Sequence, residues 1–380
     1  MLKRLFNLDW VIVGLVFILL FLGLFVLKSI FPSLFIQQLI WAIFGIFAFF
    51  IFSSIDYEHY EKLSWIFYFA SIFFLLITFL FGAITRGSVR WLEIGGVGIQ
   101  SSELVKPFLI LFLATFLSDQ RTDLKKIIYS GLLTALIALL IFLQPDLGSS
   151  LVVLFIWLGM ILAKSIKGKW IVSGLVLLGL FFPLFWRFLK GYQKERIFTF
   201  LNPSSDPLGS GFNLIQSKIA VGSGQLFGRG LGRGTQSHLQ FLPERHTDFI
   251  FASLAEELGF IGSLILILLF FFLLLKILLL AVNSRDRFAS LVCIGVFSLL
   301  FIQVFVNVGM NLGLLPITGL TLPLISYGGS SLLSTMIALG IISSIAKDKD
   351  KKRWLRLGRE NIIIRSYEKV CSYKNRWFSM

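Results

Sequence analysis

Long apolar runs separated by short polar segments make up most of the chain. A helix needs about 20 mostly apolar residues to cross the hydrocarbon core of a bilayer, and runs of about this length recur along the sequence. The pattern therefore predicts about ten membrane-spanning helices. We expect them near residues 10–27, 34–53, 64–83, 104–118, 127–144, 148–164, 170–187, 249–281, 288–312 and 325–345.

Two of these runs have unusual lengths. The run at 104–118 is short and begins with polar residues. The run at 249–281 is too long for one upright span, so we expect this helix to tilt or to protrude from the bilayer. The segment between the seventh and eighth runs, about 188–248, forms one large polar loop.

Composition supports a membrane protein and excludes the common soluble classes. Of the 380 residues, 57% are hydrophobic and only 14% are charged, whereas soluble domains carry about 25% charged residues. This balance excludes a soluble globular enzyme, a disordered chain and a collagen-like fibre. Long apolar runs also argue against a β-barrel, which is built from short alternating strands. The expected fold is all-α and polytopic.

The distribution of basic residues predicts the orientation of the chain. Lys3 and Arg4 precede the first helix, and the tail at 347–380 is strongly basic. Because cytoplasmic loops are enriched in Lys and Arg, we expect both termini in the cytoplasm, with the chain in the cytoplasmic membrane. The net charge of +15 then reflects orientation and anionic lipid rather than nucleic acid.

The large loop faces outward in this topology and yet is basic. A basic loop on the outer side suggests an anionic partner such as a phosphate or diphosphate. Its glycine-rich part, 222–236, follows no strand and is therefore not a nucleotide-binding fingerprint, although its amides could cradle an anion. A flexible lid with solvated charges is the alternative. The candidate phosphate-binding residues are Arg196, Lys218, Arg229, Arg233 and Arg245.

A second polar cluster lies where the fourth span begins. Glu103 and Lys106 are three residues apart on one helical face, shortly after Arg90. They form either an ion pair at the membrane interface or a charged pair that lines a polar cavity. Residues 144–149 form another cluster, in which Pro145 and Asp146 favour a tight turn or a helix N-cap.

Two further clusters contain the remaining candidates. Asp248 lies where the polar loop enters an apolar helix, directly after Arg245 and His246. Its carboxylate could act as a general base on a hydroxyl group, or it could simply cap the helix. The Pro- and Gly-rich stretch 316–331 could complete a polar pocket or serve close helix packing. Its candidates are Ser326, Gly328 and Gly329.

Together these motifs resemble the SEDS family of bacterial cell-wall proteins, which includes RodA, FtsW and SpoVE. The resemblance covers residues 1–346 as one transmembrane domain and is strongest at 144–148, 202–207, 222–236, 243–259 and 316–331. The sequence Glu244-Arg245-His246-Thr247-Asp248 is similar to the RodA branch. In one departure, the family usually has Gln-Pro-Ser-Glu where this chain has Gln100-Ser101-Ser102-Glu103, so that Ser101 stands in place of a proline.

This resemblance implies a fold of ten helices and a peptidoglycan glycosyltransferase that polymerises lipid II at the outer face of the membrane. It implies Asp248 as the essential carboxylate and a class B penicillin-binding protein as partner, within the elongation complex. A divalent cation, Mg²⁺ or Mn²⁺, held by Glu103 or Asp248 could assist, and no organic cofactor is expected. The alternative function is a flippase for the same lipid-linked precursor, because broken helices and buried charges also suit a transporter.

Overall fold

The structure is a computed structural model of the chain. It describes residues 8–85, 88–94, 97–119, 124–164, 187, 191–207, 209, 211–284 and 286–347. Residues 170–186 of the predicted seventh span at 170–187, and residues 348–380 of the basic tail at 347–380, lie outside the described residues.

The other predicted spans correspond to helices. Within the described residues, seven helices are long and apolar enough to cross a membrane, and two shorter helices, α6 and α8, complete the set. The helices are α2 (Trp10–Ile30), α3 (Pro32–Ser54), α4 (Tyr57–Lys62), α5 (Ser64–Phe81), α6 (Ser101–Leu117), α7 (Leu124–Leu143), α8 (Leu147–Leu162), α13 (Ile250–Asn283), α14 (Arg287–Asn311) and the final helix Gly329–Lys347.

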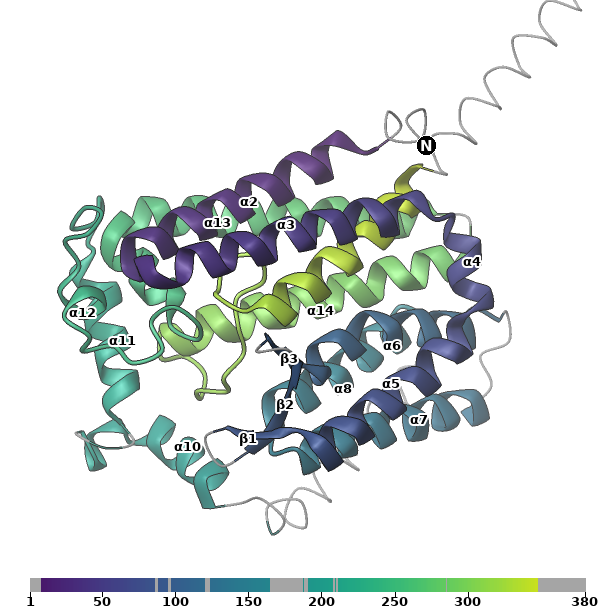
Figure 1. The fold of residues 1–380 in the computed structure, drawn as a ribbon, viewed down its shortest axis with the longest axis horizontal. Helices are drawn as coiled ribbons and strands as arrows, with labels where there is room; N and C mark the ends of the chain where they lie inside the picture. The colour runs from purple at the N-terminus through teal and green to yellow at the C-terminus, as the bar shows by residue number, and fades with distance from the viewer. Residues whose placement is uncertain are drawn as a thin grey trace, which may run out of the picture.

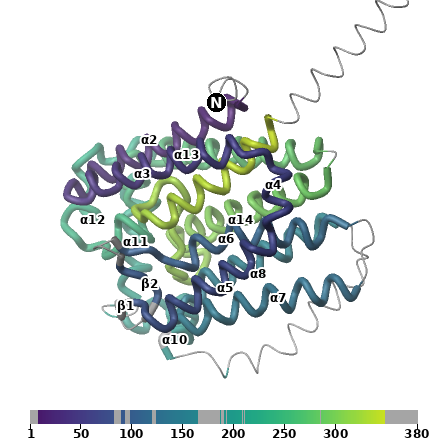
Figure 2. The backbone as a smooth tube through the Cα atoms, turned by 45° about the vertical axis from the view of Figure 1, so that its right-hand side comes forward, coloured from purple at the N-terminus to yellow at the C-terminus, as the bar shows by residue number. Residues whose placement is uncertain are grey.

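The long helices run roughly along one direction, so the molecule has two distinct ends (Figure 1). The helices of the large loop, α10 (Gly191–Leu201), α11 (Phe212–Ser223) and α12 (Thr235–His238), gather at one end with a short 3₁₀ turn, η1 (Pro203–Ser205). The start of α2 and the end of the final helix lie at the opposite end, near α4 (Figures 1 and 2). The first and last described helices therefore begin and end on one side.

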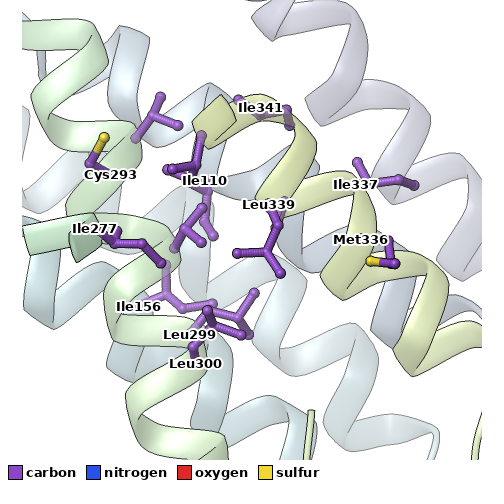
Figure 3. Packing of buried hydrophobic residues seen from close by; sticks show 14 of the residues in the cluster. Ile110, Ile156, Ile277, Cys293, Leu299, Leu300, Met336, Ile337, Leu339 and Ile341 are labelled. Atoms are coloured by element: carbon purple, nitrogen blue, oxygen red, sulfur yellow. The ribbon is translucent and has the colours of Figure 1, made fainter. Parts of the chain in front are cut away.

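The final helix lies inside the bundle rather than at its edge. Almost all of its length is buried, and its yellow tube runs between the other helices in Figure 2. Figure 3 shows the core at close range: Leu339 from this helix lies near Ile110 of α6, Ile156 of α8 and Leu299 of α14. This packing places the polar segment that precedes the final helix at the centre of the loop-bearing end.

A small antiparallel sheet was not predicted. Strands β1 (Ala83–Thr85), β2 (Ser88–Ile94) and β3 (Val97–Gln100) pair in the order β1-β2-β3, with Trp91 opposite Gln100. The segment lacks the long apolar run of a span, and β2 alternates apolar and polar residues as a strand does. The all-α polytopic fold class is confirmed, and this small sheet is an addition to it. β3 leads directly into α6.

Helix α13 corrects the expectation for the longest run. Its 34 residues are interrupted at Gly259, where φ is 69° and ψ is −164°. This conformation is accessible to glycine and strained for other residues. The length is therefore explained by a break rather than by tilt or protrusion of one continuous helix, and α13 consists of a short segment, 250–258, followed by a long one.

Candidate functional site

Asp248 lies in a turn that precedes α13 and is held by α14. Its backbone carbonyl accepts hydrogen bonds from the amide Nδ2 atoms of Asn307 and Asn311, both at 3.0 Å. The two asparagines are one helical turn apart on α14. Asn307 also donates to the carbonyl of Leu320 at 2.7 Å. One polar face of α14 thus fixes the Asp248 turn and the 316–323 segment relative to each other.

The structure does not place Asp248 at the N-cap position of α13. Helix α13 begins at Ile250 and its N-cap residue is Phe249, which makes no side-chain capping bond. Asp248 precedes the N-cap residue and is half-buried. The carboxylate lies near Gly319, because a Cβ atom placed on that glycine would be 3.6 Å from Asp248 Oδ2.

The 316–331 segment supports the Asp248 turn from the other side. The Ser326 hydroxyl donates to the carbonyl of Thr247 at 2.7 Å and accepts from the amide of Leu322 at 2.8 Å. The amide of Tyr327 donates to the carbonyl of His246 at 2.9 Å. Ser326, a predicted substrate ligand, therefore holds the backbone of the site.

The two predicted glycines of this segment pack against α3. The amide of Gly328 donates to Gln38 Oε1 at 3.2 Å, and Gln38 Nε2 donates to the carbonyl of Ser326 at 3.3 Å. A Cβ atom on Gly329 would lie 2.0 Å from the indole of Trp41, so this glycine is required for close packing. Both proposed uses of the segment, polar site and tight packing, are present.

Glu103 and Lys106 form the expected ion pair, and it is buried rather than interfacial. Lys106 is completely buried and Glu103 is 6% exposed. The Ser334 hydroxyl of the final helix donates to the carbonyl of Glu103 at 2.6 Å. The pair therefore lies inside the protein, where removal of either charge leaves the other unpaired.

Asp146 fulfils the predicted turn-and-cap role and also ties α8 to α6. Its Oδ1 accepts from the amide of Ser149 at 3.1 Å, which caps α8. Its Oδ2 accepts from Gln100 Nε2 and from the Ser102 hydroxyl, both at 3.0 Å. Arg90 of β2 donates to the carbonyls of Gln144 and Pro145 just before it. Arg90 thus serves the helix junction, not an open surface.

The basic residues of the large loop are spread over separate places. Arg196 donates to the carbonyl of Ile317 at 3.3 Å and lines a pocket of 330 Å³ between α10, α11 and that residue. Arg229 and Arg233 line a second pocket of 560 Å³ beside the 223–228 turn. Lys218 lies against Gly313. All four of these cations are exposed, whereas Arg245 is only 8% exposed.

The glycine-rich loop is built into the break of α13. The amides of Phe260 and Ile261 donate to the carbonyls of Gln225 and Leu226 at 2.8 and 3.1 Å. On the other side of the break, the carbonyls of Glu256 and Glu257 accept from the amides at positions 229 and 230, at 2.9 and 3.1 Å. Loop backbone thus replaces helical bonds lost at Gly259. The alternative of a flexible lid is not supported for this part of the loop.

Two buried carboxylates, for which the sequence suggested no role, strengthen this junction. Glu256 accepts from the amides of Gln236 and Ser237 at 2.8 and 2.9 Å. Glu257 Oε1 accepts from the Ser29 hydroxyl at 2.7 Å and pairs with His238 Nε2 at 2.8 Å. Two adjacent acidic residues in an apolar helix are costly unless their carboxylates are paired or hydrogen-bonded. The presence of Glu256 and Glu257 in this helix was therefore the feature of the sequence from which a buried polar junction could have been predicted.

Only one of the two predicted metal ligands is suited to bind a cation. Among the described residues, no group of three His, Cys, Asp or Glu side chains is arranged to hold a metal ion. Glu103 is already neutralised by Lys106, so it does not fit a cation site. Asp248 is the remaining carboxylate of the two that were predicted.

These features define a multi-span helical membrane protein with a polar site at one end of its bundle, around a carboxylate in a braced turn. Such a site, next to basic residues and at the margin of apolar helices, suits an amphipathic anionic substrate. The chain belongs to the FtsW/RodA/SpoVE family of cell cycle proteins, whose sequence model matches residues 2–351. The family expected from the motifs is confirmed.

Individual relatives agree with this assignment. The Escherichia coli K12 protein named peptidoglycan glycosyltransferase MrdB is 43% identical over 289 residues, covering 75% of this chain and 78% of that protein. A chain of a peptidoglycan synthase complex, described as coordinating polymerization and crosslinking, has a TM-score of 0.77 at 35% identity and covers 90% of this chain and 98% of its own. Thermus thermophilus rod shape determining protein RodA has a TM-score of 0.69 at 30% identity, covering 90% and 97%.

Proposed function

We propose that the chain is a peptidoglycan glycosyltransferase that polymerises lipid II into glycan strands for cell elongation. The similarity to MrdB and RodA over most of the chain supports this activity. The observation that carries the proposal is the position of Asp248, half-buried in a turn that α14 and the 316–331 segment fix by backbone hydrogen bonds. A rigidly held carboxylate is what a general base requires.

The reaction transfers a growing glycan from undecaprenyl diphosphate to the incoming lipid II. The 4-hydroxyl oxygen of the acceptor GlcNAc forms a bond to the anomeric carbon of the donor MurNAc. The bond from that carbon to the diphosphate breaks, and its electron pair leaves with undecaprenyl diphosphate. Asp248 takes the hydroxyl proton, and cationic side chains stabilise the charge that develops on the leaving group.

In this proposal the site faces outward from the cytoplasmic membrane and both termini are cytoplasmic. The basic residues near the start of the chain and in the tail support this orientation by the positive-inside rule. The described helices are compatible with it, because the start of α2 and the end of the final helix share the end opposite the large loop.

We also propose a class B penicillin-binding protein as partner, together with other proteins of the elongation complex. The structural similarity to a chain from a synthase complex that coordinates polymerization and crosslinking supports this pairing. A polymerase that supplies new glycan to a crosslinking enzyme explains why the two would act side by side.

A divalent cation, Mg²⁺ or Mn²⁺, near Asp248 belongs to the proposal as an auxiliary group that neutralises diphosphate charge. We expect excess EDTA to lower the polymerisation rate and Mg²⁺ or Mn²⁺ to restore it, whereas Ca²⁺ at the same ionic strength should restore less. A rate that does not change after EDTA and dialysis would remove the metal from the mechanism.

The decisive test is polymerisation of purified lipid II by the purified protein, with and without the partner. We expect glycan strands on a gel whenever the protein is present, and more of them with the partner. A flippase predicts translocation of lipid II across proteoliposomes and no polymer in the absence of other enzymes. Absence of polymer from a folded wild-type protein with its partner would overturn the proposed function.

A further inference from the structure

Arg245 is a buried cation whose guanidinium has no anionic partner among the described residues. It is 8% exposed, its Nε is inaccessible and makes no hydrogen bond, and no ion pair involves it. By contrast, Arg196 and Arg229 are exposed and each donates to a backbone carbonyl. A buried charge is costly unless it is paired, so the site is incomplete without an anion. Burial accordingly lowers the pKa of Arg245 below its usual value.

An aromatic residue from another part of the chain orients this cation. The guanidinium carbon of Arg245 lies 4.9 Å from the ring centroid of Phe31, within the range of a cation–π interaction. The same ring lies 4.9 Å from the His246 imidazole. Phe31 thus contacts two adjacent residues of the Asp248 turn, although the sequence marked no functional residue in α2 or α3.

The backbone around Phe31 is itself well fixed. Its amide donates to the carbonyl of Leu27 at 2.8 Å, which closes α2, and Pro32 begins α3 in the position that proline favours. Nearby, the Ser29 hydroxyl is bonded to Glu257 of α13. A ring held in this way fixes the direction of the guanidinium without using its N–H donors, so that the two terminal Nη groups stay available for a ligand.

We propose that Arg245 binds the diphosphate of the lipid-linked substrate and that Phe31 is the positioning residue that orients it. This inference rests on the proposed glycosyltransferase function and assigns the leaving-group contact to one of five candidate cations. Arg245 precedes Asp248 by three residues in one turn, so the anion receptor and the base belong to one rigid unit. Two N–H donors of a guanidinium match two phosphate oxygens, which a lysine cannot reproduce.

The test compares variants that separate the π-face of Phe31 from its size. Phe31→Leu keeps an apolar side chain without a π-face, Phe31→Tyr keeps the face, and Arg245→Lys keeps the charge without the planar fork. Phe47→Leu is the matched control, because Phe47 lies on α3, the helix that begins directly after Phe31, and is 65% exposed, away from the site. The readouts are lipid II polymerisation rates, the KM for lipid II and inhibition by inorganic pyrophosphate, with thermal unfolding as the measure of folding.

We expect Phe31→Leu to raise the KM for lipid II and weaken pyrophosphate inhibition about five- to thirtyfold, the range of a desolvated cation–π contact. Phe31→Tyr and Phe47→Leu should stay within about twofold of wild type, and Arg245→Lys should lose about tenfold or more in kcat/KM. A merely structural role for Phe31 would lower the unfolding temperature while leaving pyrophosphate inhibition unchanged, and that result would overturn the inference.

Other outcomes also bear on the inference. If Phe31→Tyr fails as badly as Phe31→Leu, the ring acts by shape alone and the inference is wrong. If a variant does not fold, the remaining variants still report pyrophosphate inhibition.

If wild-type protein makes no polymer, the proposed function fails. Calorimetric titration of wild type and Arg245→Lys with inorganic pyrophosphate and with vesicles of anionic phospholipid then decides which anion binds at Arg245. Loss of pyrophosphate binding in Arg245→Lys supports a diphosphate receptor, whereas loss of vesicle binding alone identifies a phospholipid site and overturns the assignment.

Discussion

At the residue scale, Asp248 is distinguished by how its backbone is held. Its carbonyl takes hydrogen bonds from two asparagines of α14, and the neighbouring carbonyls of His246 and Thr247 are bonded to Tyr327 and Ser326. The turn therefore has little freedom to move away from the site. Preorganisation of this kind is expected where a side chain must accept a proton in a fixed geometry.

We predict that Asp248→Asn lowers polymerisation by about 10²–10⁴, the usual contribution of general-base catalysis. Asparagine has nearly the same shape and cannot accept the proton, so folding and lipid II binding should stay nearly intact. Gel analysis of the glycan products and a lipid II binding assay measure the two effects. Polymer of wild-type amount from the variant would remove Asp248 from the catalytic role.

We predict that Glu103 and Lys106 act as one unit. Removing one partner of a buried ion pair leaves an uncompensated charge and costs roughly 3–5 kcal/mol. Glu103→Gln and Lys106→Met should each lower thermal stability and activity strongly, and the double variant should lose less than the sum of the two. A double-mutant cycle on the unfolding midpoint and on the rate gives the coupling. Additive losses would show that the pair carries no coupling.

At the element scale, the break of α13 and the glycine-rich loop are one structure. The loop supplies carbonyls to the helix that begins after Gly259 and amides to the segment that ends before it. Glu256 and Glu257 then bind α12 of the loop, and Glu257 also binds Ser29 of α2. Because the 250–258 segment follows Asp248 after Phe249 alone, the same contacts that hold the loop also hold the end of the Asp248 turn.

We predict that Gly259→Ala damages this junction. The backbone of Gly259, with φ 69° and ψ −164°, lies in a region that is essentially restricted to glycine and costs another residue about 1–3 kcal/mol. An added Cβ would also lie 2.2 Å from the amide nitrogen of Gly228, so the loop must move. The unfolding temperature and the polymerisation rate should both fall.

Gly14→Ala in α2 is the matched control for this prediction. It has no atom within 4 Å of an added Cβ, and alanine favours a helix interior by about 1 kcal/mol relative to glycine. This variant should be as stable as wild type or slightly more so. Equal stability of the two variants would mean that the break tolerates a side chain and that the loop is not wedged into it.

At the scale of the whole molecule, the large loop and the end of the final helix, after which the basic tail begins, lie at opposite ends of the bundle. We predict that truncation after Ala346 weakens binding to vesicles of anionic lipid and leaves catalysis intact, because the chemistry takes place on the other face. Vesicle flotation and lipid II polymerisation by the truncated protein measure the two properties. A folded, inserted and inactive truncated protein would contradict the prediction.

The sequence alone determined most of the architecture, since apolar length and basic loops report directly on the bilayer. It predicted the described spans, the large loop and the family, and its motifs selected Asp248 and the Glu103–Lys106 pair. It also predicted the cap at Asp146, because Pro and Asp before an apolar run act locally. These features depend on residues adjacent in the sequence or on the surrounding solvent, so they can be predicted from the sequence alone.

Only the tertiary structure decided which distant segments meet. The stacking of Phe31 on Arg245, the support of Asp248 by Asn307 and Asn311, and the loop in the break of α13 join residues far apart in the chain. Apolar periodicity does not specify such contacts, because it indicates which residues are buried and not which segment of the chain they pack against. Likewise, the positive φ of Gly259 is permitted by glycine but is selected by the loop that bonds on both sides of it.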